Sequence, residues 1–371
     1  MSIAGTLPSP FERDLLDAAR SGDEGAYQRL VEPHRRELHA HSYRMLGSVH
    51  DAEDALQDAL LRAWRGLPRF QGKSSLRSWL YRIATNTCLD LIARRPARVL
   101  PLDHEPAREP GQGFGEPLVE SVWIEPYPDD HLPADDAGVA PHARYEQREG
   151  VELAFIAALQ HLPARQRAAL ILREVLGFSA REVADTLETT PASVNSALQR
   201  ARKTLDERLP ERSQQATLRT LGDPRVREIV EAYMDAMGRG DVDAVVGMLA
   251  QDAAWSMPPL TSWFRGHDDL RGFLRRGPLS GEWRWRHLPA HASGQVAVAV
   301  YGFDEQRGHF RPFALDVLTL RGDRIAEVTA FITRTTDLPE GGEFARWPAQ
   351  ANDPRRVASV FEANGLPARL D

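Results

Sequence analysis

Hydrophobic residues recur every three or four positions over residues 11–95, with breaks at Gly22, Gly47 and 67–75. This spacing places apolar side chains on one stripe of each helix, which is the pattern of helices that pack around a shared core. The pattern therefore predicts a first all-helical unit over residues 10–96.

The rest of the chain changes character several times. Residues 97–142 are rich in proline, glycine and acidic residues and lack a period, so we expect an acidic flexible linker there. Helical spacing returns over residues 143–212. Residues 223–336 begin with two helical segments and continue with alternating, strand-like segments, and helix-compatible stretches recur in the tail 337–371. The fold class is therefore multi-domain, with two all-α domains followed by an α+β domain.

Four strand-like segments stand out in the α+β domain, at residues 253–257, 295–303, 310–320 and 325–333. Residues 321–324, Arg-Gly-Asp-Arg, join the last two segments and have the composition of a hairpin turn. We therefore expect at least one antiparallel pair of strands.

The helix predicted near residues 51–65 has an apolar stripe on one side and a charged face on the other. We expect the charged face to be exposed. The ridge consists of Asp51, Asp54, Asp58, Arg62 and Arg65, with Glu53 and Gln57 alongside. A solvated surface would explain this ridge, and so would a binding site for another protein.

The next helix, over residues 75–95, also has two faces. Its core side includes Cys88, which we expect to be a small buried hydrophobe. The opposite stripe contains Arg82, Asn86, Asp90 and Arg94 at a spacing of four. Arginines suit phosphate contacts and asparagine can pair with a base edge. The neighbouring Trp79 and Tyr81 add aromatic surface that could stack on an unpaired base, and Trp79 could instead pack in the core.

Residues 177–208 have the pattern of a helix-turn-helix. Ser179 and Glu182 form a predicted capping box, and Pro191 stands at the first position of the final helix. We expect the outward face of this final helix to be polar and basic, as a major-groove recognition helix requires. Its members are Ser193, Asn195, Ser196, Gln199, Arg200, Arg202 and Lys203.

Charge and cysteine content narrow the classes of protein. The 371-residue chain has a formal net charge of -7, which by itself disfavours nucleic-acid binding, but the basic residues are concentrated in two helices. One cysteine permits no internal disulfide, and we see no signal region and no apolar run long enough to span a bilayer. We expect a cytoplasmic protein that has no cofactor, no metal site and no membrane partner.

Three segments together resemble the extracytoplasmic-function (ECF) group of bacterial sigma factors. They are DAEDALQDALLRAW, FQGKSSLRSWLYRIATNTCLDLIARR and LPARQRAALILREVLGFSAREVADTLETTPASVNSALQRAR, and they occur in the family order. The resemblance implies sigma-70 region 2 over residues 10–96 and region 4 over residues 143–212. It also implies a protein that binds core RNA polymerase and directs transcription from specific promoters.

The resemblance assigns roles to the residues that match the family motifs. The acidic helix would dock on the clamp helices of the largest polymerase subunit through Asp51, Glu53, Asp54, Gln57, Asp58 and Arg62. The minus-ten element would meet Lys73, Ser75, Arg77, Trp79, Arg82, Asn86, Arg94 and Arg95. The minus-thirty-five element would meet Ser179, Ser193, Asn195, Ser196, Gln199, Arg200, Arg202 and Lys203.

The entry to the recognition helix departs from the family pattern. The family usually has Gly-Thr-Val-Lys/Arg-Ser-Arg there, whereas this chain has Ala-Ser-Val-Asn-Ser-Ala over residues 192–197. Two cations are thus replaced by Asn195 and Ala197. Because each phosphate contact adds affinity and salt dependence, we expect weaker DNA binding in the absence of polymerase.

Residues 223–336 resemble the SnoaL-like, NTF2-like cone, a curved sheet that encloses a pocket. The segments GDVDAVVGMLAQDAAWSMPP and WFRGHDDLRGFL and the terminal hairpin carry this resemblance. Over nearly its full length the chain is similar to the mycobacterial sigma factor G type. The candidate ligand pocket comprises Trp255, Met257, Trp263, Phe264, His287, Phe313 and Asp316, with Trp283, Trp285, Phe303 and Phe331 as further aromatic candidates. The same side chains could instead fill a core.

Two other functions fit parts of the pattern. A one-component regulator would bind operator DNA through residues 177–202 without polymerase. An isomerase or cyclase with an accessory DNA-binding region would use His287 or Asp316 as an acid or base. We predict no catalytic residue, because spacing alone places neither group near a substrate. We expect the C-terminal domain to modulate the sigma domains through an intramolecular contact or a small ligand.

Overall fold

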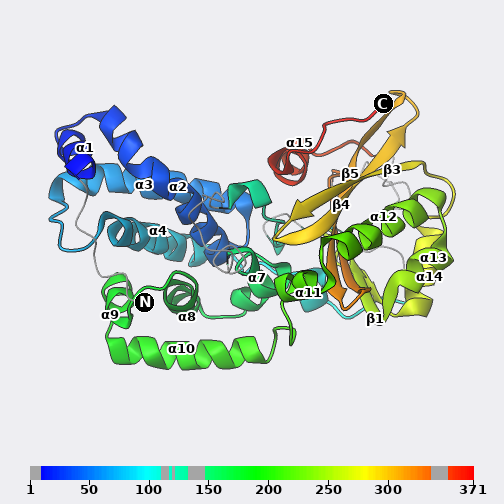
Figure 1. Ribbon diagram of the computed structural model, residues 1–371, viewed down its shortest axis with the longest axis horizontal. Coiled ribbons are helices and arrows are strands. Elements are labelled where there is room, and N and C mark those ends of the chain that lie inside the picture. The colour runs from blue at the N-terminus through cyan, green and yellow to red at the C-terminus, as the bar shows by residue number, and fades with distance from the viewer. Residues whose placement is uncertain (1–9, 110–116, 119–121, 133–146, 336–349) are drawn as a thin grey trace. The chain divides into compact units, whose positions relative to one another are not determined.

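The computed structural model describes residues 10–109, 117–118, 122–132, 147–335 and 350–371. The chain divides into two compact units (Figure 1). The first comprises Met1–Ala97, His131–Gly150 and Ala154–Leu209. The second comprises Arg98–Asp130, Val151–Leu153 and Pro210–Asp371.

The N-terminal part of the first unit is helical, as predicted. Its helices are α1 (Pro10–Arg20), α2 (Glu24–Leu46), α3 (Val49–Gly66) and α4 (Leu76–Ile92), and the turn η1 (Leu67–Arg69) follows α3. Asp23, Ser48 and Ser75 accept hydrogen bonds from the first turns of α2, α3 and α4. Gly47 ends α2 with a φ of 71°, a conformation that costs glycine little. The breaks therefore have local physical causes.

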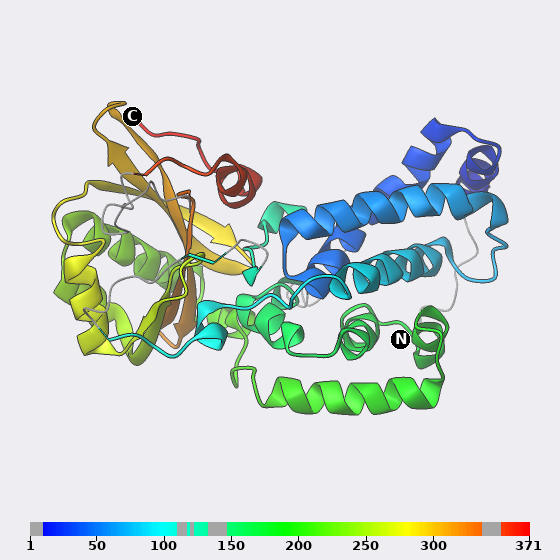
Figure 2. The ribbon, with the colours of Figure 1, turned by 180° about the vertical axis from the view of Figure 1, so that it is seen from behind.

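The C-terminal part of the first unit contains the helix-turn-helix (Figure 2). It runs through α7 (Leu153–Gln160), α8 (Ala164–Leu170), the π-helical turn η4 (Ile171–Val175), α9 (Ala180–Thr186) and α10 (Pro191–Asp206). Both halves of the Ser179–Glu182 capping box are present. Pro191 begins α10, as predicted.

In this unit the helix faces that carry the apolar side chains are the buried faces. Val194, Leu198 and Ala201 of α10 are buried, and α10 packs against α8. Cys88 of α4 is fully buried, which confirms that prediction, and burial raises the pKa of its thiol to about 12. The thiol therefore stays protonated and acts as a core side chain.

The second unit contains a six-stranded sheet with strand order β2-β1-β6-β5-β4-β3. The strands are β1 (Leu249–Ser256), β2 (Trp263–Arg265), β3 (Trp285–Ala292), β4 (Gln295–Asp304), β5 (His309–Arg321) and β6 (Arg324–Ile332). Only the β1–β6 pair is parallel. Arg321 pairs with Arg324 across Gly322, which has a φ of 61°, so the predicted hairpin is confirmed.

Helices cover one face of this sheet and form its main core with it. They are α11 (Gln214–Leu221), α12 (Asp223–Arg239), α13 (Val242–Met248) and α14 (His267–Arg276). Buried residues of α12, α13 and α14 join those of the strands in one hydrophobic cluster. The two helices and four strands predicted for this domain correspond to α12, α13, β1, β4, β5 and β6, whereas α11, α14, β2 and β3 were not predicted. β2 has three residues, and β3 alternates only partly buried and exposed positions, so neither has a strong pattern.

Part of the segment predicted as a flexible linker over 97–142 has a definite place in the second unit. The backbone N–H of Arg108 donates to the Trp263 carbonyl at 2.8 Å, and that of Leu118 donates to the Pro259 carbonyl at 3.1 Å. Trp123, Ile124 and Tyr127 are buried. The expectation of a flexible linker is therefore wrong for these described residues, because a few apolar side chains in a polar segment suffice to hold it on the sheet.

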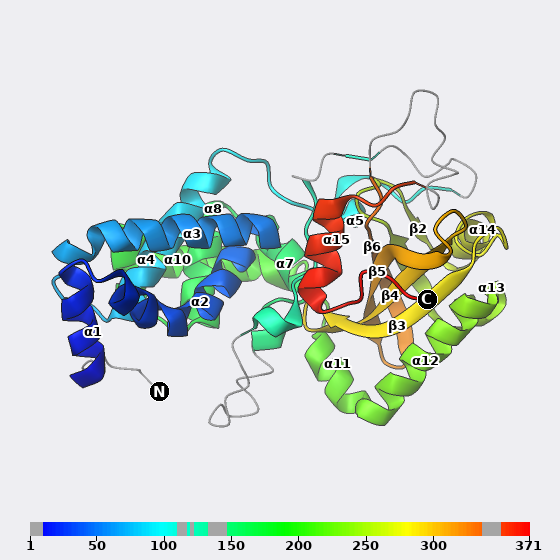
Figure 3. The ribbon, with the colours of Figure 1, turned by 90° about the horizontal axis from the view of Figure 1, so that it is seen from above.

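The tail lies against the sheet of the second unit (Figure 3). It contains α15 (Pro354–Val360) and the turn η6 (Glu362–Asn364). Phe361 is fully buried, and its ring meets Tyr301 edge-on at 5.3 Å. The backbone of Leu370 bonds to Phe310 of β5. The described part of the tail therefore belongs to the α+β domain.

Glu152 holds the segment Val151–Leu153 in place within the second unit. Its two carboxylate oxygens accept from the backbone N–H groups of Gln214 at 3.0 Å and Gln215 at 2.8 Å, at the start of α11. Gln295 meanwhile accepts from the Leu153 N–H at 3.0 Å. A buried carboxylate at a helix N-terminus satisfies two donors that the helix itself leaves free.

We expect Glu152→Ala to lower the free energy of unfolding of the second unit by about 2 to 3 kcal/mol, because two buried N–H groups lose their acceptor. Thermal denaturation would measure this loss, and amide exchange at Gln214 and Gln215 would rise. Glu211→Ala, at an exposed glutamate just before α11, is the matched control. Unchanged exchange at α11 in the Glu152 variant would show that the carboxylate does not hold this helix.

Candidate functional sites

The charged face of α3 is largely exposed. The side chains of Asp54, Asp58 and Arg62 are 53%, 47% and 43% exposed. Gln57 donates to Glu53 at 3.1 Å on the same helix. These residues form the α3 ridge, and the structure brings them together as one surface.

Asp51 does not belong to the α3 ridge. It is only 4% exposed and forms an ion pair with Arg95 at the end of α4. The sequence-based expectation that Asp51 is exposed was therefore wrong, because a partner 44 residues away covers it. Arg95, expected at the minus-ten element, is likewise engaged in this pair.

One hydrophobic residue on α3 was missed by the sequence analysis. Leu61 is 46% exposed although it is large and apolar. It lies one turn after Gln57 and Asp58 and precedes Arg62, so it adds apolar surface to the α3 ridge. Helical spacing could have identified it, since Leu61 falls outside the apolar stripe.

Arg62 links α3 to α4. Its guanidinium bonds to Asp58 at 2.9 Å and to Asp90 of α4 at 2.8 Å. The hydrogen bond to Asp90, together with these two carboxylates, raises the pKa of Arg62. Such exposed pairs contribute little to stability, about 0 to 1 kcal/mol. Their charges therefore remain available to a partner.

The outward stripe of α4 contacts α9 within the first unit. Arg82 donates to Glu188 at 3.2 Å, and Ser78 donates to Glu182 at 3.3 Å. A groove of about 420 Å³ lies between these elements, lined in part by Lys73 and Trp79. Carboxylates of α9 and of the turn that follows it thus lie next to cations that the sequence analysis assigned to DNA.

The predicted minus-ten residues differ in how accessible they are. Lys73, Ser75, Arg82 and Arg94 are exposed, whereas Asn86 is half-buried. Arg77 donates to Glu37 at 2.9 Å and its guanidinium lies 4.8 Å from the centre of the Tyr81 ring. Arg77 therefore supports the fold in this arrangement.

The two aromatic candidates of α4 differ as well. Trp79 is half-buried, and its ring lies 4.8 Å from that of Phe70. Tyr81 is 1% exposed and donates to Glu37 at 3.2 Å. Of the two, only Trp79 has surface that a base could reach, so the expectation of stacking on Tyr81 was wrong.

The outward face of α10 matches its predicted composition. Each of its predicted members is exposed: Ser193, Asn195, Ser196, Gln199, Arg200, Arg202 and Lys203. Arg202 also pairs with Glu174 at 2.6 Å. Ser179, predicted with this group, is exposed but uses its hydroxyl in the capping box, where it accepts from the Glu182 N–H at 3.2 Å.

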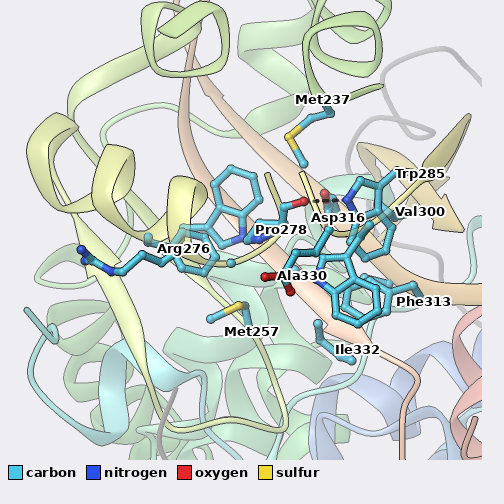
Figure 4. A pocket seen from close by; sticks show the side chains of 16 residues that line it. Met237, Met257, Arg276, Pro278, Trp285, Val300, Phe313, Asp316, Ala330 and Ile332 are labelled. Atoms are coloured by element: carbon cyan, nitrogen blue, oxygen red, sulfur yellow. Dashed lines mark hydrogen bonds between the residues drawn. The ribbon is translucent and has the colours of Figure 1, made fainter. Parts of the chain in front are cut away.

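A cavity of about 80 Å³ lies inside the second unit, between the sheet and the helices that cover it (Figure 4). Four of the predicted pocket residues line it: Trp255, Met257, Phe313 and Asp316. Trp283 and Trp285 line it too, whereas Phe303 and Phe331 do not. Met237, Phe273 and Arg276 were not predicted, since α14 was missed and Met237 looks like an ordinary core position of α12.

The three remaining predicted residues lie elsewhere. Trp263 donates through its indole N–H to the Glu105 carbonyl at 2.7 Å, and Phe264 stacks on Phe273 at 4.7 Å. His287 is on β3 but is not part of the cavity lining. Burial lowers the pKa of His287 to about 4, so the imidazole is neutral at pH 7.

Asp316 is the buried polar group of the cavity. It is 2% exposed and accepts a hydrogen bond of 2.8 Å from the Tyr233 hydroxyl of α12. Burial raises the pKa of Asp316 to about 7, and the hydrogen bond from Tyr233 offsets only part of that rise. Burial also raises the pKa of Tyr233, followed by the Asp316 charge. This carboxyl is therefore poised to gain or lose a proton near neutral pH.

Neither a metal centre nor a membrane span emerges from the part of the chain that the structure describes. Among those residues, no three histidine, cysteine or acidic side chains are grouped as a metal site would require. No described helix is both long enough and apolar enough to cross a bilayer.

Comparison with known proteins identifies each domain. Residues 30–98 match the family described as sigma-70 region 2, residues 152–205 match sigma-70 region 4, and residues 230–328 match the SnoaL-like domain. The ECF RNA polymerase sigma factor SigG of Mycobacterium tuberculosis is 41% identical over 87% of this chain and 84% of its own length. The RNA polymerase sigma-H factor of Pseudomonas aeruginosa is 28% identical over 55% of this chain and 96% of its own length.

A solved structure shares the fold. The crystal structure of the extracytoplasmic function sigma factor SigJ of Mycobacterium tuberculosis has a TM-score of 0.53 and 21% identity, and it covers 88% of this chain and 96% of that one. The two helical sigma domains and the SnoaL-like domain thus occur in the same order and fold as in a known sigma factor. The chain therefore belongs to the ECF family of RNA polymerase sigma factors and carries a fused SnoaL-like domain.

Proposed function

We propose that three surfaces of the first unit have separate roles in transcription initiation, and that the SnoaL-like domain restrains the sigma domains that carry these surfaces. Sigma factors bind core RNA polymerase and promoter DNA. In this chain the α3 ridge would dock on the clamp helices of the largest polymerase subunit. The stripe of α4 would engage the minus-ten element, and the outward face of α10 would read the minus-thirty-five element.

The α3 ridge is the observation that carries this proposal. Asp54, Asp58 and Arg62 are exposed although the fold does not need them there, and Leu61 adds an exposed apolar side chain between them. Charged rims around an apolar contact are typical of protein interfaces. A one-component regulator would need the helix-turn-helix but no such ridge, so this surface favours docking on polymerase.

The DNA-facing helices support the remaining two roles. On α10, Asn195 and Gln199 are exposed one turn apart and can pair with adenine edges, while Arg200 and Lys203 can contact phosphates. Arg82 on α4 and Lys73 in the loop before this helix supply cations beside the half-buried Trp79. With few phosphate contacts, we expect affinity for duplex DNA to depend on polymerase.

Restraint by the SnoaL-like domain would act through the segment that joins regions 2 and 4. Within the second unit, Trp123 and Tyr127 are buried after the end of region 2, and Glu152 anchors the start of region 4. Anchoring both ends of a connecting segment limits how far the two sigma domains can separate. Binding to polymerase and promoter requires them to reach two sites, so release of these anchors would favour initiation.

We further propose that the SnoaL-like domain is not an enzyme. Asp316 is the one buried acid in the described cavity lining, and His287, the other acid-base candidate, does not line that cavity. General acid-base chemistry requires groups within hydrogen-bond reach of a shared substrate. The regulatory role needs no such pair.

Run-off transcription with purified core polymerase tests both parts of the proposal. The full chain should direct initiation from selected promoters. The Glu152→Ala variant and a truncation ending near Arg212 should both initiate several-fold more efficiently, because each weakens the anchors in the second unit. The Glu152 variant is needed in addition to the truncation, because the truncation also exposes Trp123 and Tyr127.

The outcomes separate the two parts. Absence of initiation by every form, together with tight binding of the full chain to duplex DNA alone, would support the one-component regulator. Initiation that is equal or weaker in both released forms would leave the docking surfaces intact but refute the restraint. Glu211→Ala, at the exposed glutamate before α11, serves as the control for the loss of a glutamate side chain.

A further inference from the structure

The Asp316 carboxyl lies in the cavity of the SnoaL-like unit, and no cationic side chain of the described residues pairs with it. Among the residues that the structure describes, the hydroxyl of Tyr233 is its one hydrogen-bond partner, and it bonds to Oδ2 at 2.8 Å. A carboxylate can accept about four hydrogen bonds. Burying an ionised carboxylate without a counter-charge is costly. The site therefore has capacity for a donor, and most of all for a positively charged one.

The walls of the cavity are aromatic on several sides. The indole rings of Trp255, Trp283 and Trp285 line it together with the rings of Phe273 and Phe313. The faces of aromatic rings attract cations, and indole attracts them most strongly. A buried carboxylate within such walls is the combination that recognises organic ammonium groups.

We propose that this cavity binds a hydrophobic organic amine, with the protonated nitrogen at Asp316 and the apolar body against the tryptophans. This inference goes beyond the proposed role in initiation and does not depend on it. A bound amine supplies the counter-charge that Asp316 lacks. Burial has already raised the pKa of Asp316, so ion pairing with the ligand would bring the ionised form back.

Charge around the cavity is consistent with a cationic ligand. The other charged residues of its described lining are Glu282 and Arg276, both exposed at the rim. Figure 4 shows the Arg276 side chain extending away from the labelled residues around Asp316. The neighbouring His287, on β3, is neutral at pH 7 because burial lowers its pKa to about 4. The buried guanidinium of Arg334 lies 5.3 Å from the centre of the Phe313 ring, which lines the cavity. Among the described residues, no arginine or lysine forms a hydrogen bond or ion pair with Asp316.

The size and chemistry of the cavity exclude other cations. A single carboxylate surrounded by aromatic rings offers too few oxygen ligands for magnesium or calcium. The volume of about 80 Å³ is smaller than the roughly 150 Å³ of a cavity that holds benzene. It admits an ammonium head and a few carbons, and a longer body must pass the half-buried Trp283 and Trp285.

Calorimetric titration of the full chain with matched probes tests the proposal. The probes are pentylamine, pentanol and pentanoate, with propylamine and propanol as a smaller pair. At pH 8 each amine should bind at least ten-fold more tightly than the alcohol with the same carbon chain, and pentanoate should not bind. Between pH 8 and pH 6 the affinity for amine should fall about ten-fold, because Asp316 becomes protonated.

Variants identify the group that recognises the amine. Asp316→Asn should lose at least ten-fold in affinity for amine but keep its affinity for the alcohol. Tyr233→Phe retains the carboxyl group but removes the hydrogen bond that lowers its pKa, so this variant should still bind amine, and the fall in amine affinity should occur at a higher pH. Asp252→Asn, which removes an exposed carboxylate of β1 paired with Arg321, is the matched control and should leave affinity unchanged.

Three results would overturn the proposal. One is equal or tighter binding of the alcohols, with affinity that rises as the pH falls, which would indicate a neutral ligand that accepts a hydrogen bond from the protonated Asp316 carboxyl group. Another is unchanged amine affinity in Asp316→Asn. The third is the absence of millimolar binding by both amines to the unmodified chain and to Tyr233→Phe.

Discussion

Replacing Asp54 and Asp58 by lysine is expected to reduce promoter-directed initiation at least a hundred-fold while the helical unit stays folded. Both side chains are about half exposed, and their contacts with His50 and Arg62 lie on the surface. Loss of such pairs costs about 0 to 1 kcal/mol of stability. Like charges brought together across an interface instead cost several kcal/mol of binding. The defect should therefore lie in the affinity for core polymerase.

Fluorescence anisotropy with labelled core polymerase would measure that affinity, and run-off transcription would measure its consequence. Lysine at Asp14 and Asp17 of α1 is the matched control, because it makes the same change in net charge at another exposed helical surface. Circular dichroism should show the same helical content in both double variants. Normal transcription by the α3 variant would count against docking through the α3 ridge and favour an operator-binding regulator.

Replacing Asp316 by asparagine is expected to change the pH dependence of stability of the SnoaL-like unit. In the folded protein the pKa of this carboxyl is about 7, against an ordinary value of 3.8. The folded state therefore holds the proton more tightly than the unfolded state does. Its contribution to stability is fully present below about pH 4 and is lost as the pH rises to about 7. The free energy of unfolding falls by roughly 4 kcal/mol over this range. The asparagine variant should not show this fall, because its side chain does not ionise.

Comparison with the variant is necessary because His287 acts in the opposite direction. In the folded state the pKa of His287 is about 4, which is lower than the ordinary 6.5. The contribution of His287 to the free energy of unfolding therefore rises as the pH increases from about 4 to 6.5. Urea denaturation of both proteins at pH 4.5 and pH 8 would isolate the Asp316 contribution as a difference of differences. The amide oxygen of the introduced asparagine can still accept the Tyr233 hydroxyl hydrogen bond. A stability difference between the two proteins that does not change with pH would show that Asp316 is ionised at its ordinary pKa in the folded state.

Local sequence determined most of the helical architecture and its polarity. The period of 3.6 residues placed α2, α3, α4 and α10, and the capping box of Ser179 and Glu182 and the proline at 191 placed the starts of α9 and α10. These features depend on neighbours within one or two turns, so they can be predicted without knowledge of the fold. For the same reason the exposed members of the α10 face were predicted correctly, and the two-residue hairpin at Gly322 was too.

Only the tertiary structure decided which polar groups remain accessible. Asp51 has the spacing of an exposed residue but is buried by Arg95, and Tyr81 is covered within the first unit. The Tyr233–Asp316 hydrogen bond joins residues 83 positions apart, and residues 98–130 belong to the second unit through contacts with strands much later in the chain. Burial and ion pairing depend on distant segments that the fold brings together. The hydrophobic period of a helix or strand indicates which side of the element is apolar. It does not indicate which distant residues pack against the polar side.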